Sequence, residues 1–480
     1  MINTLQTILI ILGISLLHAK VSIAPQSGSE VLIEFTNVDK QFNTQPSQSF
    51  KSGTSPQGNI ITVDDSQTFQ KLDGFGASFT DSTAYLMKNL PEKERWDVLR
   101  KLFDPHNGIG ISYIRLPISV TDFSLTNYTY DNMPPGKTDP LLQNFSLAHD
   151  EEYIIPLLKD ILTLNPKLQI IVSPWTAPAW MKNTDDLMGT TDGVSSFLKP
   201  EFYASYALYF VKIIQGYARH GITIQTMTIQ NEVLYGPDSY PGMTMSKEAQ
   251  TTFLNNYLGP AFISAGINTK VMVFDHNWID ADYPEYVLGH LNLFSSKIVG
   301  GTAIHCYDGE VTNQTRIHDK FPNFPIYMTE CSGFDYRTDF TEVLLYDMQN
   351  LLIGVVNNWG SVSIKWNIAL DQNKGPQNGG CPNCLGLIEI NTDTGKVKYN
   401  PDYYTVGIFS RFALPGSVRI QVTSNNDNLL VTGFKRPDGT IAVVVLNQGK
   451  TDQNFSLNWN NSFIQVTIPK VTVGVYVWSP

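Results

Sequence analysis

The chain has 480 residues, of which 42% are hydrophobic, 11% aromatic and 16% charged, and its formal net charge is −11. This composition is typical of a folded protein with a large core and excludes a disordered or fibrous chain. The acidic balance argues against a nucleic-acid partner, which would require a basic surface. The length accommodates a barrel of about 250 residues or more together with a small second domain.

The first residues, MINTLQTILIILGISLLHA, have the pattern of a secretory signal peptide, an apolar run that ends on a small residue. The run is too short for a membrane span. We expect residues 1–19 to be removed, so that the mature chain begins near Lys20. The protein should then be soluble and follow the secretory route, to the outside of the cell or to an acidic, lysosome-like compartment. Nothing in the sequence indicates an oligomeric state.

From about residue 70 the sequence repeats one unit, a short apolar strand followed by a loop and an amphipathic helix. Eight segments fit the strand: 71–79, 111–119, 168–176, 224–232, 270–278, 301–307, 324–332 and 362–370. Helical patterns lie between them, for example over 200–221 and 341–360. Near-continuous apolar strands that alternate with helices indicate a parallel sheet. Eight units predict a (β/α)8 TIM barrel over residues 69–414. A doubly wound open sheet is the alternative, but no G-x-G-x-x-G motif opens a helix.

After about residue 415 the pattern changes to short alternating runs separated by turns. These runs cover 417–424, 428–436, 440–448, 463–469 and 471–479. They predict an antiparallel β-sandwich over residues 415–480. Residues 24–68 contain two further strand-like runs, EVLIEF and NIITVDD, which we expect to join it. Both chain ends would then build one accessory domain beside the barrel.

The chain has four cysteines, too few for a disulfide scaffold of this size. Cys381 and Cys384 lie in the sequence CPNC, but no second ligand pair completes a zinc site. A local disulfide and two structural thiols both remain open for this loop. N-glycosylation sequons occur at Asn127, Asn144, Asn313, Asn454 and Asn460. Their number is about what chance predicts, so they do not indicate whether the chain is glycosylated.

The candidate catalytic groups lie at the carboxyl ends of the predicted strands, where barrels of this kind place their active sites. The fourth strand ends at Asn231 and Glu232 and the seventh at Glu330. Strands three apart face each other across the barrel mouth, so the two carboxylates could flank one bond. The other strand ends carry Arg115, Asp122, Trp175, Trp180, His276, Trp278, His305, Tyr307, Trp366 and Asn367. Each of these alone would more often be structural, but a ring of aromatic, amide and carboxylate groups suits a sugar.

The ordered motifs of the chain resemble those of glycoside hydrolase family 30. They run from QKLDGFGASFTDSTAYLM through SYIRLPISVTDFSLTNYTY, SPWTAPAWMK, TIQNE and SYPGMTM to YMTECSG and KWNIALDQNKGP. The resemblance covers nearly the whole mature chain, including the terminal β-domain. SPWT, DFS…YTY and NFSL are similar to the glucosylceramidases of the family. SYPGMTM and GGCPNC are more similar to microbial members, some of which cleave β-1,6-glucans.

The resemblance implies that Glu232 is the general acid/base and Glu330 the nucleophile of a retaining mechanism that needs no cofactor or metal. It implies a substrate-binding set supported by Arg115 and made of Asp122, Trp175, Asn231, Tyr240, His305, Tyr307 and Trp366. Two features depart from the family pattern. Val233 stands where a proline usually follows the acid/base, which should loosen the loop. The loop after the eighth strand is rebuilt around Cys381 and Cys384, where either Asn378 or Asn383 is a candidate to replace a glucose-binding Asn of the animal enzymes.

The resulting expectation is a secreted retaining β-glucosidase acting on glucosylceramide or a related β-glucoside. Hydrolysis of a glycolipid would require a transient contact with a lipid interface or detergent, because the chain shows no basic amphipathic helix. The alternative is an endo-β-1,6-glucanase on the same scaffold, which needs an open groove with further sugar subsites. A carbohydrate-binding protein without catalysis is less favoured, because both glutamates are present.

Overall fold

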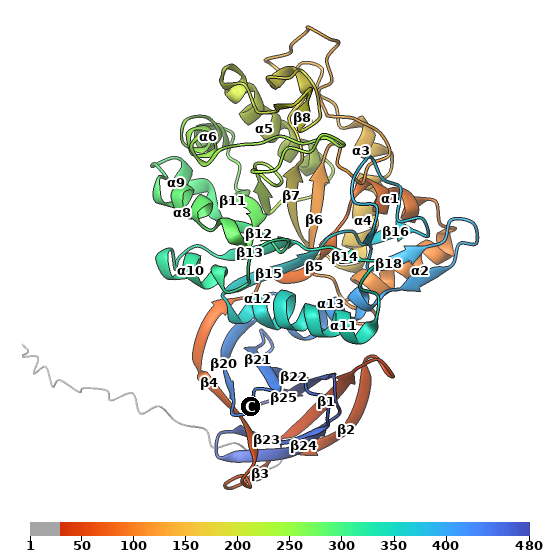
Figure 1. Ribbon diagram of the computed structural model, residues 1–480, viewed down its shortest axis with the longest axis vertical. Helices are drawn as coiled ribbons and strands as arrows, with labels where there is room; N and C mark the ends of the chain where they lie inside the picture. The colour runs from red at the N-terminus through yellow and green to blue at the C-terminus, as the bar shows by residue number, and fades with distance from the viewer. Residues whose placement is uncertain (1–28) are drawn as a thin grey trace, which may run out of the picture.

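The computed structural model describes residues 29–480 and has a barrel joined to a separate β-domain (Figure 1). Eight parallel strands close the barrel, in the order β5-β6-β7-β10-β11-β12-β13-β15. Their bounds are Gly74–Ser78, Tyr113–Ile118, Gln169–Pro174, Thr226–Thr228, Lys270–Asn277, Val299–His305, Ile326–Glu330 and Gly360–Lys365. The predicted TIM barrel is therefore confirmed. The predicted signal peptide lies outside the described residues.

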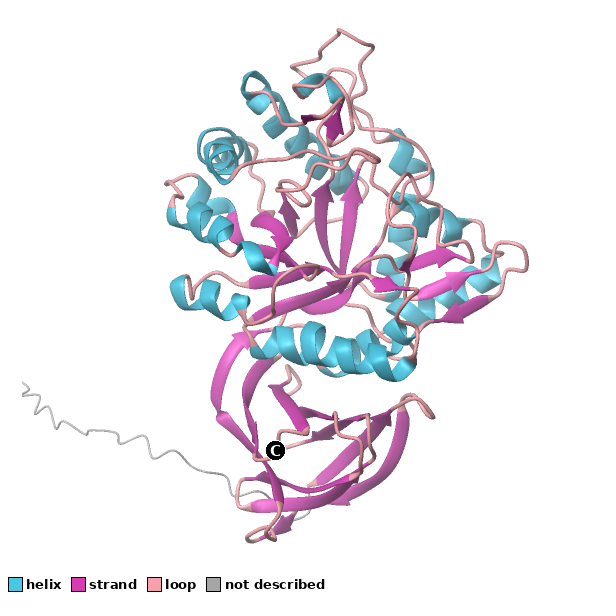
Figure 2. Cartoon of the chain, in the orientation of Figure 1, coloured by secondary structure: helices cyan, strands magenta, loops and turns pink. Residues whose placement is uncertain are grey.

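Helices follow the strands and cover the outside of the barrel (Figure 2). They are α1 Asp81–Lys88, α2 Glu92–Phe103, α3 Ala148–Glu152, α4 Ile154–Leu164, α5 Tyr203–Arg219, α6 Lys247–Phe253, α7 Gly259–Ser264, α8 Asp282–Gly289, α9 Ser295–Ile298, α10 Asn313–Lys320, α11 Phe340–Tyr346, α12 Ile353–Asn357 and α13 Pro401–Phe412. The helix predicted over 341–360 contains a π-helical segment, η5 (Asp347–Leu352), between α11 and α12. In the part of the chain that the structure describes, no helix has the length and apolar character needed to cross a membrane.

The β-domain is one ten-stranded sheet of order β2-β1-β25-β22-β21-β20-β4-β23-β24-β3. The N-terminal strands are β1 Glu30–Thr36, β2 Asn43–Ser49, β3 Lys51–Ser52 and β4 Asn59–Lys71. The C-terminal strands are β20 Val418–Ser424, β21 Leu429–Lys435, β22 Ile441–Asn447, β23 Gln453–Trp459, β24 Ser462–Ile468 and β25 Thr472–Trp478. The prediction that both chain ends build this domain is confirmed. The pairing is antiparallel except between β4 and β23, which are parallel.

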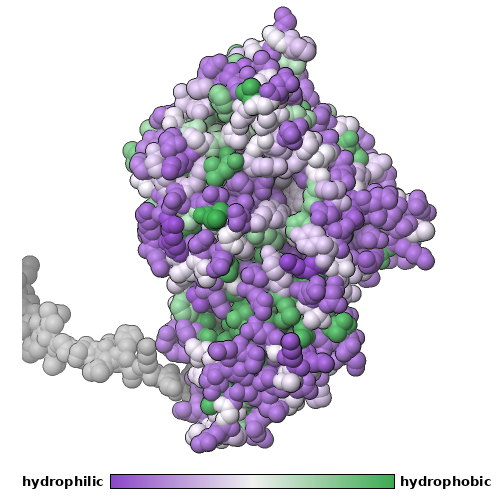
Figure 3. All heavy atoms as spheres, viewed as in Figure 1, coloured by the Kyte–Doolittle hydropathy of each residue, from purple (hydrophilic) through white to green (hydrophobic). Residues whose placement is uncertain are grey.

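The sheet of the β-domain packs on itself and on the barrel. Its inner residues, among them Val443, Leu457 and Trp478, form an apolar core of their own. Alternate residues of the same strands point to the other face and join the core of the barrel, as Phe434 does against Phe409 of α13, with ring centroids 6.0 Å apart. Apolar side chains gather where the two parts meet (Figure 3). The β-domain thus braces the barrel on the side of α12 and α13.

The fourth predicted strand ends early and the eighth is divided, and both differences shape the site. The ladder of β10 covers only Thr226–Thr228, so the predicted segment 224–232 leaves the sheet before its polar end. Glu232 then takes a left-handed conformation with φ of +47°, outside the range of a regular strand. Likewise the segment 362–370 divides into β15 and a separate short strand, β16 (Ala369–Asp371). Asn231, Glu232 and Trp366 therefore lie on turns directly after the strands.

Candidate active site

Glu232 and Glu330 face each other across the carboxyl end of the barrel. Glu330 is the last residue of β13, and Glu232 lies on the turn after β10. One carboxylate oxygen of each lies within 4.8 Å of the other, and both lie as close to a ring nitrogen of His305. The structure thus brings together the two carboxylates that the sequence places on the fourth and seventh strands.

Glu330 is held by two hydrogen-bond donors. Arg115, on β6, donates from Nη1 to Glu330 Oε2 in a fully buried ion pair. Tyr307, which follows β12, donates its hydroxyl to Glu330 Oε1 at 2.8 Å. Arg115 also donates from Nη2 to Asn231 Oδ1 at 2.7 Å. Because the amide oxygen of Asn231 is already bonded, its NH2 group is left to donate to a ligand.

Asp275, a residue that the sequence analysis did not single out, is the centre of the charged network. It lies on β11 with a fully buried carboxylate. Oδ2 accepts from Arg115 Nη2 at 2.8 Å, and Oδ1 accepts from His305 Nε2 at 3.0 Å. Hydroxyl groups from three other strands of the barrel also donate to it, those of Ser173, Thr228 and Thr329. Burial opposes its ionisation, but the charges of Arg115 and His305 hold the pKa of Asp275 well below its usual range. A single buried anion therefore orients the cations of the site.

His305 connects this anion with Glu232. Its Nε2 bonds to Asp275 and its Nδ1 lies 3.3 Å from Glu232 Oε1. Burial alone would lower its pKa, but the charges of Glu330 and Asp275, with the hydrogen bonds to Asp275 and Glu232, raise the pKa of His305 to about 9. The ring is then an imidazolium near neutral pH, and both of its nitrogens donate.

The two glutamates titrate as one system because they lie so close together. Burial raises the pKa of Glu330, and the charge of Glu232 adds to this, while His305 and Arg115 oppose it. At Glu232 the hydrogen bond and charge of His305 outweigh the effect of burial, so the pKa of Glu232 lies below the ordinary value of a glutamate. Repulsion between two close carboxylates favours a state in which the pair keeps one proton over an acidic range.

The predicted substrate-binding residues lie around this pair. Trp175 and Trp366 are buried and stacked, with ring centroids 5.1 Å apart, and the Arg115 guanidinium lies 4.8 Å from the centroid of Trp175. Tyr240 packs against the same aromatic cluster. Asp122 is buried, and its Oδ1 has no hydrogen-bond partner among the described residues. Burial, with the charges of Glu330 and Glu232, raises the pKa of Asp122 well above its usual value. Asp122 is thus a polar group without a protein partner, suited to a ligand hydroxyl.

The loop after β15 closes one side of the site. Cys381 and Cys384 form a disulfide, which answers the question left open for CPNC. Gly380 packs so closely on Asp122 that a Cβ atom on the glycine would lie 2.2 Å from Asp122 Cβ. The backbone N–H of Asn378 donates to the carbonyl of Asp122 at 2.6 Å, whereas the carbonyl of Asn383 accepts from Asp335. Of the two candidate residues, Asn378 therefore adjoins Asp122, although its side chain bonds to Asn127.

Other residues from the strand ends have structural partners. Trp180 donates to Asp131, and Trp278 donates to Gln314. His276 lies 4.0 Å from Glu232, and burial lowers its pKa. The loop after Glu232 is fixed without the family proline, because Val233 is buried and its carbonyl accepts from Met245 N–H at 2.8 Å. The expected loosening of this loop stays a prediction.

Glu232, His305 and Glu330 form the one cluster of metal-ligating groups found among residues 29–480. Each of these groups already has a protein partner. His305 Nδ1 lies 3.3 Å from Glu232 Oε1, and its Nε2 lies 3.0 Å from Asp275 Oδ1. The guanidinium of Arg115 already supplies positive charge to Glu330. The arrangement suits acid–base and nucleophilic chemistry by the carboxylates themselves.

The chain belongs to glycosyl hydrolase family 30. The family's TIM-barrel domain matches residues 72–413, and its beta sandwich domain matches residues 416–474. The protein is therefore a glycoside hydrolase, as the motifs indicated.

Relatives with two different activities are similar to this chain. It is 34% identical over 413 residues to the endo-1,6-beta-D-glucanase neg1 of Aspergillus fumigatus, covering 81% of each chain. It is 29% identical over 460 residues to the lysosomal acid glucosylceramidase of Mus musculus, covering 90% of this chain and 85% of the relative. A solved endo-beta1,6-glucanase structure has a TM-score of 0.85 and 31% identity, covering 94% of this chain and 99% of that chain.

Proposed function

We propose that this protein is a retaining endo-β-1,6-glucanase. The observation that carries the mechanism is the separation of Glu232 and Glu330, whose nearest oxygens lie within 4.8 Å. Retaining glycosidases hold their two carboxyl groups about 5–5.5 Å apart, whereas inverting enzymes need about 6.5–9.5 Å to admit a water. The short separation supports direct attack by a carboxylate on the sugar.

In the first step a Glu330 oxygen attacks the anomeric carbon while the glycosidic C–O bond breaks. Glu232 gives its proton to the departing oxygen, so the pair's shared proton must lie on Glu232 at this moment. Arg115 and Tyr307 both donate to Glu330 and favour its anion once the proton is on Glu232. A covalent glycosyl ester on Glu330 results.

In the second step Glu232, now a carboxylate, takes a proton from a water that attacks the anomeric carbon. The ester bond breaks and Glu330 leaves as a carboxylate, which the same two donors stabilise. The free NH2 group of Asn231 is suited to donate to the sugar 2-hydroxyl, a contact that strengthens in the transition state. The product keeps the β configuration.

The glucan substrate is supported by the relatives and by the loop after β15. The two endo-1,6-beta-glucanases are more similar to this chain than the glucosylceramidase is. The rebuilt loop with Gly380 and the Cys381–Cys384 disulfide packs directly on Asp122, at the edge of the site. These findings favour the alternative drawn from the sequence over glucosylceramide, which was the first expectation.

The test compares purified protein on a linear β-1,6-glucan and on glucosylceramide in detergent. We expect a mixture of oligosaccharides early in glucan hydrolysis, because an endo enzyme cuts within the chain, and little release of ceramide. Release of ceramide without cleavage of the glucan would contradict the substrate but leave the two-carboxylate mechanism in place.

We also propose that the protein follows the secretory route. Two disulfides, Cys306–Cys331 and Cys381–Cys384, support this, because disulfides persist in oxidising compartments. The signal pattern of residues 1–19 supports it as well. Expression in a eukaryotic host should release into the medium a protein whose N-terminus lies near Lys20; retention of an uncleaved chain in the cell would contradict it.

A further inference from the structure

One disulfide lies directly behind the catalytic residues. Cys306 stands between His305 and Tyr307, and Cys331 follows Glu330. The two cysteines are joined, with Cα atoms 5.4 Å apart. His305 contacts Glu232, and Tyr307 donates to Glu330. One covalent cross-link therefore joins the segment that carries His305 and Tyr307 to the segment that carries Glu330.

The cross-link lies where the ladder between two barrel strands ends. The last residue pair of β12 and β13 is His305 with Glu330, and the register shifts between Ile304 and His305. Beyond that pair the backbones share a hydrogen bond from Cys306 N–H to the Glu330 carbonyl, at 3.3 Å. Both chains then leave the sheet as loops. A covalent bond here restricts the backbone where the regular ladder has ended.

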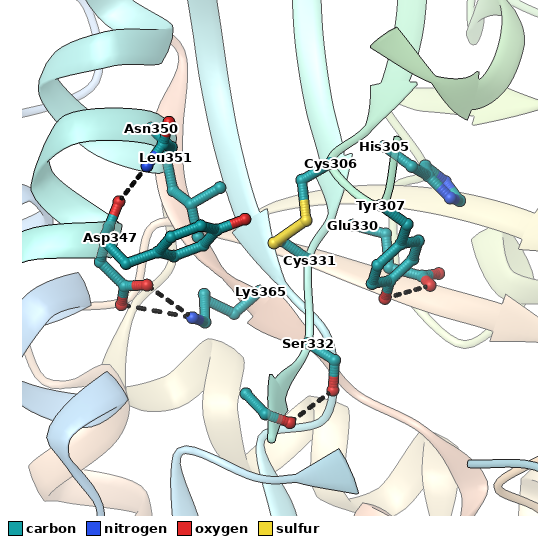
Figure 4. The surroundings of a disulfide bond; sticks show 12 residues. His305, Cys306, Tyr307, Glu330, Cys331, Ser332, Asp347, Asn350, Leu351 and Lys365 are labelled. Atoms are coloured by element: carbon teal, nitrogen blue, oxygen red, sulfur yellow. Dashed lines mark hydrogen bonds and ion pairs between the residues drawn. A yellow bond between two sulfur atoms is a disulfide. The ribbon is translucent and has the colours of Figure 1, made fainter. Parts of the chain in front are cut away.

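The disulfide points away from the substrate side. The side chains of Cys306 and Cys331 lie on the side toward η5, and those of His305, Tyr307 and Glu330 lie on the other side (Figure 4). Figure 4 shows the disulfide between these catalytic side chains and Leu351 of η5. Both cysteines are buried, and the Cys331 carbonyl accepts from the Trp366 N–H at 2.8 Å. The disulfide therefore acts on the backbone and has no direct contact with the sugar.

We propose that the Cys306–Cys331 disulfide is a positioning element of the active site, which keeps the Tyr307 hydroxyl on the Glu330 carboxylate. This inference rests on the proposed role of Glu330 as nucleophile and is independent of which β-glucoside is cleaved. A disulfide that only stabilised the fold would affect unfolding but leave catalysis unchanged in the folded protein. A positioning disulfide affects the protonation of Glu330, because the Tyr307 hydrogen bond favours its ionised form.

The test compares the double variant Cys306→Ala/Cys331→Ala with the control Val445→Ala, which lowers stability in the apolar core of the β-domain, away from the site. Both are assayed on an aryl β-glucoside or β-gentiobioside that the wild type cleaves, at a temperature where circular dichroism shows them folded. We expect the first variant to lose roughly ten-fold to a hundred-fold in kcat. The acidic limb of this variant's pH–rate profile should move to higher pH, because Glu330 must lose its proton without the help of Tyr307. The control should keep the acidic limb of the wild type.

A double-mutant cycle sharpens the test. Tyr307→Phe should move the acidic limb in the same direction in the wild type and add little to the variant without Cys306–Cys331, because both changes remove the same contact.

If the variant without Cys306–Cys331 does not fold, the wild type is treated with a phosphine, and thiol alkylation is followed by mass spectrometry. Activity should then fall as Cys306 and Cys331 become accessible to alkylation, and a reduced aliquot that is not alkylated should recover it on reoxidation. A less stable but fully active enzyme with an unmoved acidic limb, or retained activity after reduction, would overturn the proposal.

Discussion

The barrel and the β-domain bury different kinds of side chain. Within residues 29–480, every buried charged residue lies in the barrel, from Asp81 to Asp402. The core of the β-domain consists of aliphatic and aromatic residues such as Val445, Leu457 and Trp459. Burying a charge costs free energy unless partners surround it, and the barrel provides such partners at the ends of its strands. The barrel thus gives up part of its apolar packing for an oriented electrostatic site, while the β-domain only packs.

The largest expected effect is that of Glu330→Gln. The change keeps the size of the side chain but removes the attacking carboxylate, so turnover should fall roughly 10⁴-fold or more on every substrate. The matched control is Glu342→Gln at an exposed position of α11, which should leave turnover unchanged. Initial rates on β-1,6-glucan and on an activated glucoside measure both. A modest loss for Glu330→Gln would mean that the nucleophile lies elsewhere.

The second effect concerns Asp275, which touches Arg115 and His305 but is placed to contact no sugar. Asp275→Asn removes the anion between two buried cations, which should cost about 3–5 kcal/mol of unfolding free energy. Turnover should fall as well, because Arg115 and His305 lose their orientation. Denaturant titration and steady-state kinetics measure the two losses. If both remain at wild-type values, the charged network does not organise the site.

The third effect is a pH dependence of stability due to His305. Its pKa is raised to about 9 in the folded protein from an ordinary value of 6.5. The stabilisation is therefore fully present below pH about 6.5 and is lost as the pH rises through about 9, to a total of at most about 3 kcal/mol. Chemical unfolding at a series of pH values should show this decline, and His305→Gln should abolish it. An identical slope in the variant would rule out His305 as its source.

The smallest effect belongs to the β-domain. Val445→Ala creates a small cavity in its apolar core, which should cost about 2 kcal/mol of stability. Because no catalytic group contacts this core, kcat and the pH profile should match the wild type wherever the protein is folded. A change in kcat would show that the two domains are coupled more tightly than their cores suggest.

The barrel could be predicted from the sequence because its strands are nearly continuous apolar runs between amphipathic helices. Three strands of the β-domain, β2, β3 and β23, were missed, since NTQPSQS, KS and QNFSLNW carry too few apolar residues to show a pattern. Their place in the sheet is set by pairing with β1, β4 and β24. Such pairing is a tertiary effect that no local pattern reports.

The active site shows the same contrast between residues that the local sequence reveals and residues whose role depends on tertiary contacts. Glu232 and Glu330 could be found because each ends an apolar run with a carboxylate. Asp275 lies inside the run KVMVFDHN, and its importance depends on five side chains from other strands that donate to it. An aspartate within one apolar strand was the available signal. The pairing of Cys306 with Cys331, 25 residues apart, likewise depends on the adjacency of β12 and β13.

The most direct test of the two-carboxylate site is to trap its covalent intermediate. A 2-deoxy-2-fluoro β-glucoside or β-gentiobioside with a good leaving group should inactivate the enzyme slowly, because the fluorine slows both steps and the second more. Peptide mass spectrometry should then find one glycosyl group on Glu330, in the segment YMTECSG. A label on Glu232, or release of the α-anomer as the first product with no label at all, would contradict the account.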